Sequence, residues 1–163
     1  MKKEVSDLNK QITEIELLNK MAKYCAYQDR CIDDLKKLCD KYELPVTLRK
    51  KITKRMISEG FIDEERYVRS YVFGKLRNNY WGKLKISFAL KHKDIDDNLI
   101  QKVINEVEES EYEYLISDLI KKKSTSMREV DPYIRKNKIA RFLIQKGFES
   151  DLVWKSINIL KVI

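Results

Sequence analysis

Glycine and proline are scarce in this chain of 163 residues, with four glycines and two prolines in all. Residues that interrupt helices are therefore rare, while Lys, Glu, Leu and Ile are abundant. No segment shows the sustained alternation of β-branched and polar residues that is typical of strands. The composition predicts an all-α protein, and the length suffices for one ordinary domain with a buried core.

Residues that carry chemistry are also few. The single histidine, His92, cannot form a histidine metal cluster or support a nucleophile network. Cys25, Cys31 and Cys39 are six and eight residues apart, unlike the C-x-x-C pairs of zinc sites. Their odd number favours reduced thiols, and Cys25 and Cys39 fall on apolar helix stripes. Glycine-rich phosphate-binding motifs are absent. We therefore expect no catalysis, no metal and no cofactor.

Long apolar runs are missing as well. The first residues, MKKEVSDLNKQ, are too polar for a signal peptide, and no run approaches the length of a membrane span. We expect a cytoplasmic protein. Its net charge of +8 and pI near 9.2 favour a polyanionic partner, which could be nucleic acid, an acidic protein or a membrane surface.

The positive charge is concentrated in two segments. Residues 66–93 contain eight Lys or Arg and no Asp or Glu. Residues 94–120 contain nine acidic residues and one basic residue, whereas 121–146 contain nine basic and two acidic residues. An acidic segment therefore separates two basic ones.

Apolar periodicity predicts nine helices. Their expected ranges are about 12–27, 32–41, 46–59, 64–77, 82–93, 97–109, 110–123, 132–145 and 150–160. We expect Asp63, Asp96 and Asp131 to cap helices, and Gly60 and Gly147 to end them. Turns are expected at 78–79 and 124–126.

The helices follow an internal repeat with offsets of 51 and 53 residues. When Leu44, Ile95 and Phe148 are aligned, apolar residues also coincide in the preceding and following helices. The aligned sets are Leu35, Ile86 and Ile139; Cys39, Leu90 and Leu143; Leu48, Leu99 and Leu152; and Met56, Val107 and Leu160. We therefore expect three tandem three-helix, helix-turn-helix-like repeats that form an elongated, curved body. The expected domains are a polar extension (1–11) and repeats at 12–60, 61–109 and 110–163.

Basic side chains project from the expected core of several helices. In the helix from residue 64, Arg66, Arg69, Phe73 and Arg77 lie opposite the apolar half. Such a face is either solvated or a phosphate-binding surface. Tyr80 and Trp81 could stack on bases or fill the joint between repeats. The candidate contacts for a nucleic-acid-containing partner are Arg66, Arg69, Arg77, Lys83, Lys91, Lys138 and Arg141, with Phe73, Tyr80 and Trp81 as candidate stacking residues.

The segment 60–71, GFIDEERYVRSY, resembles a signature of the RecX family of bacterial recombination regulators. Residues 138–143, KIARFL, and 146–148, KGF, resemble the ending of the family's third unit. The sequence departs from the family at 78–82, NNYWG, where many members have a shorter basic turn with Gly and Pro. Its first unit also differs, since Cys31, Asp33 and Asp34 replace more typical basic or Ser residues.

The resemblance implies three tandem three-helix units and a role in DNA repair, recombination and the SOS response. Proteins of the family bind the groove of the RecA filament on DNA and suppress ATP hydrolysis, strand exchange and coprotease activity. The implied partners are the RecA filament and single- or double-stranded DNA, with no membrane partner, and we expect a monomer. The residues alone also allow a stand-alone helix-turn-helix-like DNA-binding protein or a structural helical adaptor.

Overall fold

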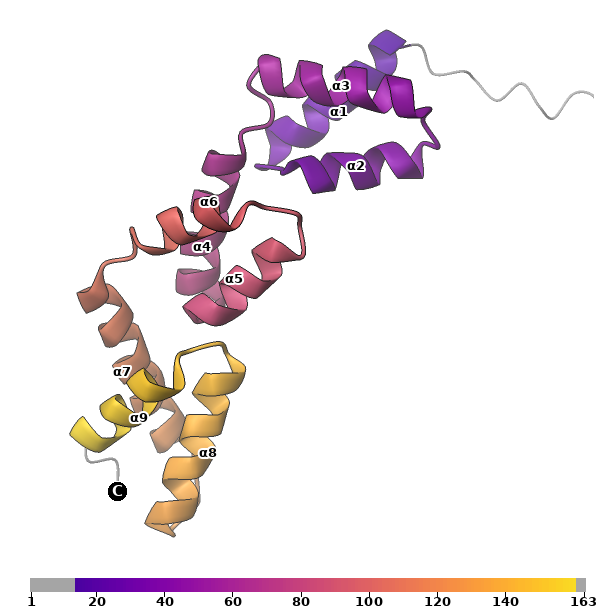
Figure 1. Cartoon of the computed structure of the whole chain (residues 1–163). Coiled ribbons are helices and arrows are strands. Elements are labelled where there is room, and N and C mark those ends of the chain that lie inside the picture. Colours follow the sequence, from indigo (N-terminus) through magenta and orange to yellow (C-terminus); the bar gives the residue numbers. More distant parts are fainter. Residues whose placement is uncertain (1–13, 161–163) are drawn as a thin grey trace, which may run out of the picture. The chain divides into compact units, whose positions relative to one another are not determined.

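Every regular element in residues 14–160, the part of the chain that the structure describes, is an α-helix. The structure is a computed structural model (Figure 1). Its helices are α1 (Glu14–Tyr27), α2 (Ile32–Lys41), α3 (Val46–Ser58), α4 (Glu64–Asn79), α5 (Lys83–Lys91), α6 (Asp97–Ile104), α7 (Glu109–Thr125), α8 (Pro132–Gln145) and α9 (Ser150–Ile159). The predicted all-α, repeated helical fold is confirmed. The expected extension at 1–11 and the expected helix start at residue 12 lie outside the described residues.

The backbone repeats the same turn in each group of three helices. The second helix is followed by a residue with left-handed backbone: Glu43 (φ 51°), Asp94 (φ 57°) and Gly147 (φ 90°). The amide of the next residue then donates to the carbonyl five positions earlier, at 3.2, 3.4 and 3.2 Å. This hydrogen bond satisfies a carbonyl at the helix end that has no partner within the helix. The three turns therefore lie at equivalent positions of the sequence repeat, directly before the aligned residues Leu44, Ile95 and Phe148.

Burial follows the same register. The two aligned sets on the second helices have exposed fractions of at most 1%; they are Leu35, Ile86 and Ile139, and Cys39, Leu90 and Leu143. Equivalent positions are thus core positions in all three groups, as the sequence predicts.

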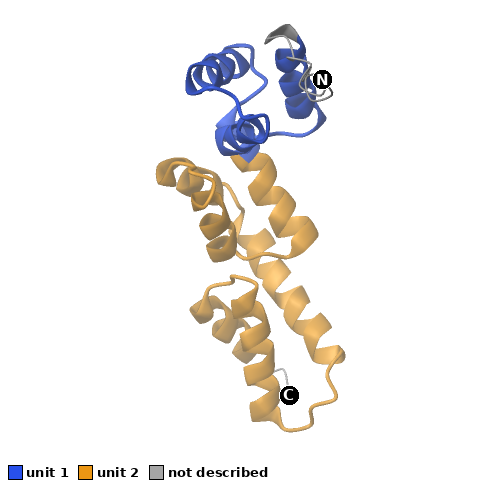
Figure 2. Ribbon diagram, turned by 90° about the vertical axis from the view of Figure 1, so that its right-hand side faces the viewer, with its two compact units in different colours: residues 1–67 blue, residues 68–163 orange. Residues whose placement is uncertain are grey.

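The chain divides into two compact units, residues 1–67 and 68–163 (Figure 2). In unit 1, α1, α2 and α3 enclose a core that includes Leu17, Leu18, Met21, Cys25, Leu35, Cys39, Ile52, Met56 and Ile62. All three cysteines are buried and none forms a disulfide. Burial raises the pKa of the Cys25 and Cys39 thiols, so these side chains act as small apolar groups, as expected.

The predicted capping residues perform that role. Asp63 Oδ1 accepts from the Arg66 amide at 3.0 Å, and Asp131 Oδ1 accepts from Ile134 at 2.9 Å. Asp96 accepts from two amides in the first turn of α6. Each carboxylate satisfies amides that have no partner inside the helix.

Several helix ends differ from the prediction, and the largest differences are in α4, α6 and α7. α4 continues through the expected turn at 78–79 and ends at Asn79, because the next residue, Tyr80, has a φ of 55°. α6 ends at Ile104 rather than near residue 109. The chain turns directly after it, where the amides of Glu106 and Val107 donate to the carbonyls three residues earlier, and this turn buries Val107. α7 extends to Thr125. The hydroxyls of Thr125 and Ser126 donate to the carbonyls of Lys122 and Lys123 in its last turn.

Within unit 2, the N-terminus of α5 lies against the turn between α8 and α9. Gly82 N–H donates to the Lys146 carbonyl at 2.8 Å, and Leu84 N–H donates to the Gly147 carbonyl at 3.1 Å. Between them, Lys83 N–H donates to the Tyr112 hydroxyl at 3.0 Å. An α-helix leaves its first amides without intrahelical partners, so α7 and the α8–α9 turn together cap α5. We call this contact the α5 joint.

Two glycines allow the α5 joint to form. A Cβ atom on Gly82 would overlap the carbonyl of Gly147, and a Cβ on Gly147 would overlap the backbone of Lys85. Gly147 also has a φ of 90°, in the region that favours glycine. The two backbones therefore approach more closely than any larger residue allows.

Gly82→Ala should open the α5 joint, because the neighbours of Gly82 are backbone atoms that cannot rotate away. We expect the free energy of unfolding to fall by about 2–3 kcal/mol, the usual cost of overpacking. Gly74→Ala is the matched control, since Gly74 lies inside α4 with no atom near its Cβ position. That change should be neutral or stabilising by up to about 1 kcal/mol. Equal effects of the two substitutions in urea denaturation would contradict this account.

Tyr112 should make stability depend on pH at the alkaline end. Burial, and then the hydrogen bond from its hydroxyl to Glu149 Oε2 at 2.7 Å, raise the Tyr112 pKa above its ordinary value near 10. The contribution of Tyr112 to the free energy of unfolding is complete below pH 10. It declines above pH 10, because the unfolded chain then releases a proton that the folded chain retains.

Tyr112→Phe should remove this alkaline decline and lower stability at neutral pH by about 1–2 kcal/mol, because the Lys83 amide loses its acceptor. Urea unfolding at several pH values measures both effects. Tyr114→Phe, at a side chain that is 74% exposed, is the control. It should change neither the alkaline decline nor the stability at neutral pH. An unchanged alkaline slope in Tyr112→Phe would exclude this role.

Candidate nucleic-acid interface

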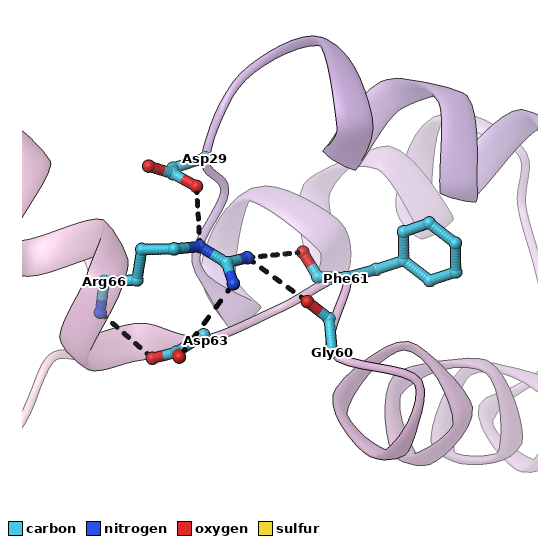
Figure 3. A network of polar contacts seen from close by, with 5 residues as sticks. All are labelled: Asp29, Gly60, Phe61, Asp63 and Arg66. Carbon is cyan, nitrogen blue, oxygen red and sulfur yellow. Dashed lines mark hydrogen bonds and ion pairs between the residues drawn. The ribbon is translucent and has the colours of Figure 1, made fainter.

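Arg66 lies in the first turn of α4 and is held by its own unit (Figure 3). Its Nε donates to Asp29 Oδ1 at 2.9 Å, after the end of α1. One of its terminal nitrogens donates to the carbonyls of Gly60 and Phe61 at 3.2 and 3.4 Å. Its other terminal nitrogen lies 4.0 Å from Asp63. Arg66 thus joins the α1–α2 and α3–α4 connections, and its planar guanidinium suits this multiple contact.

Arg69 and Arg77 pair with the acidic segment of the chain. Arg69 contacts both carboxylate oxygens of Glu106, at 2.9 and 2.6 Å. Arg77 contacts both oxygens of Glu111, at 2.8 and 3.1 Å. The hydrogen bond with Glu111 raises the pKa of Arg77, and the same bond lowers the pKa of Glu111. The acidic segment therefore neutralises part of the basic face predicted on α4.

The other four predicted cations lie in different settings. Lys91 pairs with Asp97 at 2.9 Å, and Lys138 pairs with Glu129 at 2.6 Å. Lys83 lies with its ammonium 4.5 Å from the centre of the Tyr112 ring. Arg141 is exposed on α8 and forms no ion pair with any described residue.

The three candidate stacking residues are partly accessible. Phe73 is half-buried beneath the Arg77 guanidinium, 5.1 Å from its ring centre. Tyr80 is 37% exposed. Trp81 is half-buried, with Lys75 and Lys85 at 5.0 and 4.5 Å from its ring centre.

A second aromatic ring with two lysines lies on the other side of the α5 joint. Lys123 and Lys146 lie 5.0 and 5.4 Å from the centre of the half-buried Phe142 ring. Lys146 connects this ring to the Trp81 turn, since its carbonyl accepts from Gly82 and its ammonium contacts the Asn79 carbonyl at 3.3 Å. We call these residues the lysine–aromatic cluster; its members are Lys75, Trp81, Lys85, Lys123, Phe142 and Lys146.

A groove of about 680 Å³ adjoins this cluster. Its lining is Lys123, Met127, Arg128, Glu129, Val130, Lys138, Arg141, Phe142 and Gln145. Arg135 does not line the groove, but its guanidinium donates to the carbonyls of Ser124 and Glu129 and so ties the end of α7 and the α7–α8 connection to α8. The groove therefore presents several cations around one aromatic ring and one carboxylate.

Sequence reasoning identified Trp81, Lys138 and Arg141 but missed Lys75, Lys85, Lys123 and Lys146. Phe142 is half-buried. A contact between a lysine and an aromatic ring can be predicted from sequence only when the two residues are three or four positions apart, as Trp81 and Lys85 are. Lys146 follows Phe142 at the same spacing of four residues, whereas Lys123 comes from α7, so only the folded chain brings Lys123 to this ring.

Among the described residues, one set of potential metal ligands is close enough to consider, namely Cys31, Asp33 and Asp34. Cys31 and Asp34 form the capping box of α2, and Asp33 pairs with Lys37 at 2.6 Å. Helix capping accounts for this group. Within residues 14–160, no helix is long and apolar enough to cross a membrane.

The fold and the composition together define a class: a basic, all-α protein built from repeated three-helix units. Comparison with known proteins gives the family. Residues 63–104 match the model of the second three-helix domain of RecX, and residues 110–157 match that of the third.

The chain belongs to the RecX family. It is 33% identical over 138 residues to the regulatory protein RecX of Streptococcus uberis, covering 83% of this chain and 51% of that protein. It is 32% identical over 103 residues to RecX of Legionella pneumophila, covering 63% of this chain and 66% of the relative. The chain thus spans about half the length of the curated relative from Streptococcus uberis.

A solved structure shares the fold. The crystal structure of RecX from Lactobacillus salivarius superposes with a TM-score of 0.81 at 22% identity, and the match covers 92% of this chain and 97% of that one. The predicted RecX family is therefore confirmed by the sequence comparisons, and the predicted fold by the solved structure.

Arg66→Lys should destabilise unit 1, because an ammonium cannot reach the Asp29 carboxylate and the two carbonyls in one plane. The side chain is about half exposed, so we expect a loss of about 1 kcal/mol in the free energy of unfolding. Arg141→Lys is the control and should change stability by less than about 0.5 kcal/mol. Thermal denaturation measures this difference. Equal melting temperatures of the two variants would contradict the structural role of Arg66.

Proposed function

We propose that this chain is a negative regulator of the RecA recombinase. It binds the groove of the RecA–DNA filament and thereby inhibits ATP hydrolysis, strand exchange and coprotease activity, which modulates DNA repair and the SOS response. Its membership in the RecX family is the observation that carries this proposal. In this role it acts as a cytoplasmic monomer without catalytic activity of its own.

The surface of unit 2 supports a contact with the DNA inside such a filament. Lys75, Lys85, Lys123 and Lys146 form no ion pair with a described residue, and they surround the faces of Trp81 and Phe142. Lysines bind backbone phosphates through charge, while aromatic rings stack on unpaired bases without regard to sequence. A filament groove offers phosphate backbone and extended bases together, and the lysine–aromatic cluster matches this combination.

The seven cations predicted from the sequence remain candidate contacts. Arg69, Arg77, Lys91 and Lys138 would exchange an intramolecular carboxylate for a partner's phosphate or carboxylate. Exposed ion pairs contribute little to stability because water screens them, so this exchange costs little. Arg141 needs no exchange.

A charge-reversal experiment tests the surface. Lys75→Glu combined with Lys85→Glu should raise the concentration needed for half-inhibition of RecA-dependent ATP hydrolysis by about tenfold or more, because two favourable phosphate contacts become repulsive. Lys155→Glu, on α9 and outside the cluster, is the matched control and should inhibit like the parent chain. Circular dichroism verifies that helicity is retained. Full inhibition by the double variant would exclude the lysine–aromatic cluster as a contact.

The main rival is a stand-alone DNA-binding protein, which the basic helices also allow. The two functions differ in stoichiometry. A filament regulator should slow RecA-dependent ATP hydrolysis when far fewer chains than RecA subunits are present. A DNA-coating protein should inhibit only near saturation of the DNA, and this result would contradict the proposal.

A further inference from the structure

Helix α3 in unit 1 carries a second apolar stripe that its own core does not use. Its core side chains include Ile52 and Met56, each 1% exposed. On another side, Val46 is 63% exposed and Ile57 is 46% exposed. Residues eleven apart lie on the same face of a helix, about 16 Å from each other. The two apolar side chains therefore mark the ends of one exposed stripe.

A groove of about 580 Å³ runs along this stripe. Between Val46 and Ile57 its lining includes Lys50 and Thr53, which follow the same helical spacing of four and then three residues. Lys36 of α2 lines it as well, with Arg49, Lys54 and Ser58. The stem of Lys50 and the methyl of Thr53 connect the two apolar ends, so the floor is continuous and three helical turns long.

The edges of the groove are positively charged. The α3 sequence, VTLRKKITKRMIS, has five basic residues and no acidic residue. Lys50 and Lys54 form no ion pair with any described residue, whereas Arg49 is held by Asp40 and the Leu44 carbonyl. No described carboxylate therefore offsets these two lysines beside the accessible apolar surface.

We propose that this groove is a docking site for an acidic amphipathic helix of a partner protein. The occupant carries an apolar stripe about three turns long, which packs between Val46 and Ile57, and Asp or Glu residues beside it face Lys50 and Lys54. This is the helix-in-groove mode of peptide recognition, with the charges selecting the partner.

The apolar floor favours a protein helix over duplex DNA. Phosphates would use the lysines but would leave Val46 and Ile57 facing a polar backbone. Exposed apolar surface with a polar rim is the usual mark of a protein contact. The test of this site is independent of the proposed regulation of RecA, because it contains no recombinase.

Fluorescence anisotropy with the full chain tests the site. The probe is a labelled synthetic helix with leucines at spacings of four, three and four residues, flanked by glutamates. Two matched probes replace the leucines by serine or the glutamates by lysine. The acidic leucine probe should bind at least about tenfold more tightly than either, since the floor and the rim both contribute.

Variants locate the binding surface. Ile57→Glu should weaken binding of the acidic leucine probe about tenfold or more, and Lys50→Glu with Lys54→Glu should weaken it and reduce its salt dependence. Ile144→Glu is the control, because Ile144 on α8 is 42% exposed and does not line this groove; binding should be unchanged.

Two results would overturn the proposal. The first is failure of the acidic leucine probe to bind, or equal binding by the parent chain and Ile57→Glu. The second is tight binding of a labelled DNA duplex that Lys50→Glu with Lys54→Glu abolishes and Ile57→Glu leaves intact. That pattern would assign the face to nucleic acid.

Discussion

Unit 2 depends on the capping of one helix by residues distant in the chain. The first amides of α5 have no partner within the helix, and the carbonyls of Lys146 and Gly147 and the Tyr112 hydroxyl accept from them. Two of these bonds, from Gly82 and Leu84, are backbone to backbone and flank the close contact between Gly82 and Gly147, so they fix position more strictly than side-chain packing would. The lysine–aromatic cluster is a consequence, since the α5 joint brings the turn holding Trp81 next to Lys146 and Phe142.

Ion pairs explain the division of charge along the chain. The acidic segment does not only separate two basic ones; Glu106 and Glu111 bind Arg69 and Arg77 of α4. Arg69 and Arg77, whose guanidinium groups suit bidentate contacts, are thus used within the protein, whereas the lysines of the lysine–aromatic cluster form no ion pair with a described residue. Arg66, in the signature that resembles the RecX family, likewise joins two connections of unit 1 (Figure 3). The signature therefore includes an architectural residue.

Much of the fold could be predicted from local sequence, and much of the site could not. Helix faces, the caps at Asp63, Asp96 and Asp131 and the register of Leu35, Ile86 and Ile139 all follow from spacing and side-chain chemistry. The end of α4 was misplaced because Tyr80, not an asparagine, adopts the left-handed backbone. The pairs Arg69–Glu106 and Arg77–Glu111 join residues 37 and 34 positions apart, so no helical period reveals them.

We propose that this chain binds in the groove of a RecA–DNA filament. An electron cryo-microscopy map of RecA filaments on single-stranded DNA, formed with the full chain and ATP, tests this most directly. The account predicts helical density in the groove, with the lysine–aromatic cluster of unit 2 facing the DNA. Filaments with an empty groove at saturating protein, or density only along DNA that lacks RecA, would contradict it.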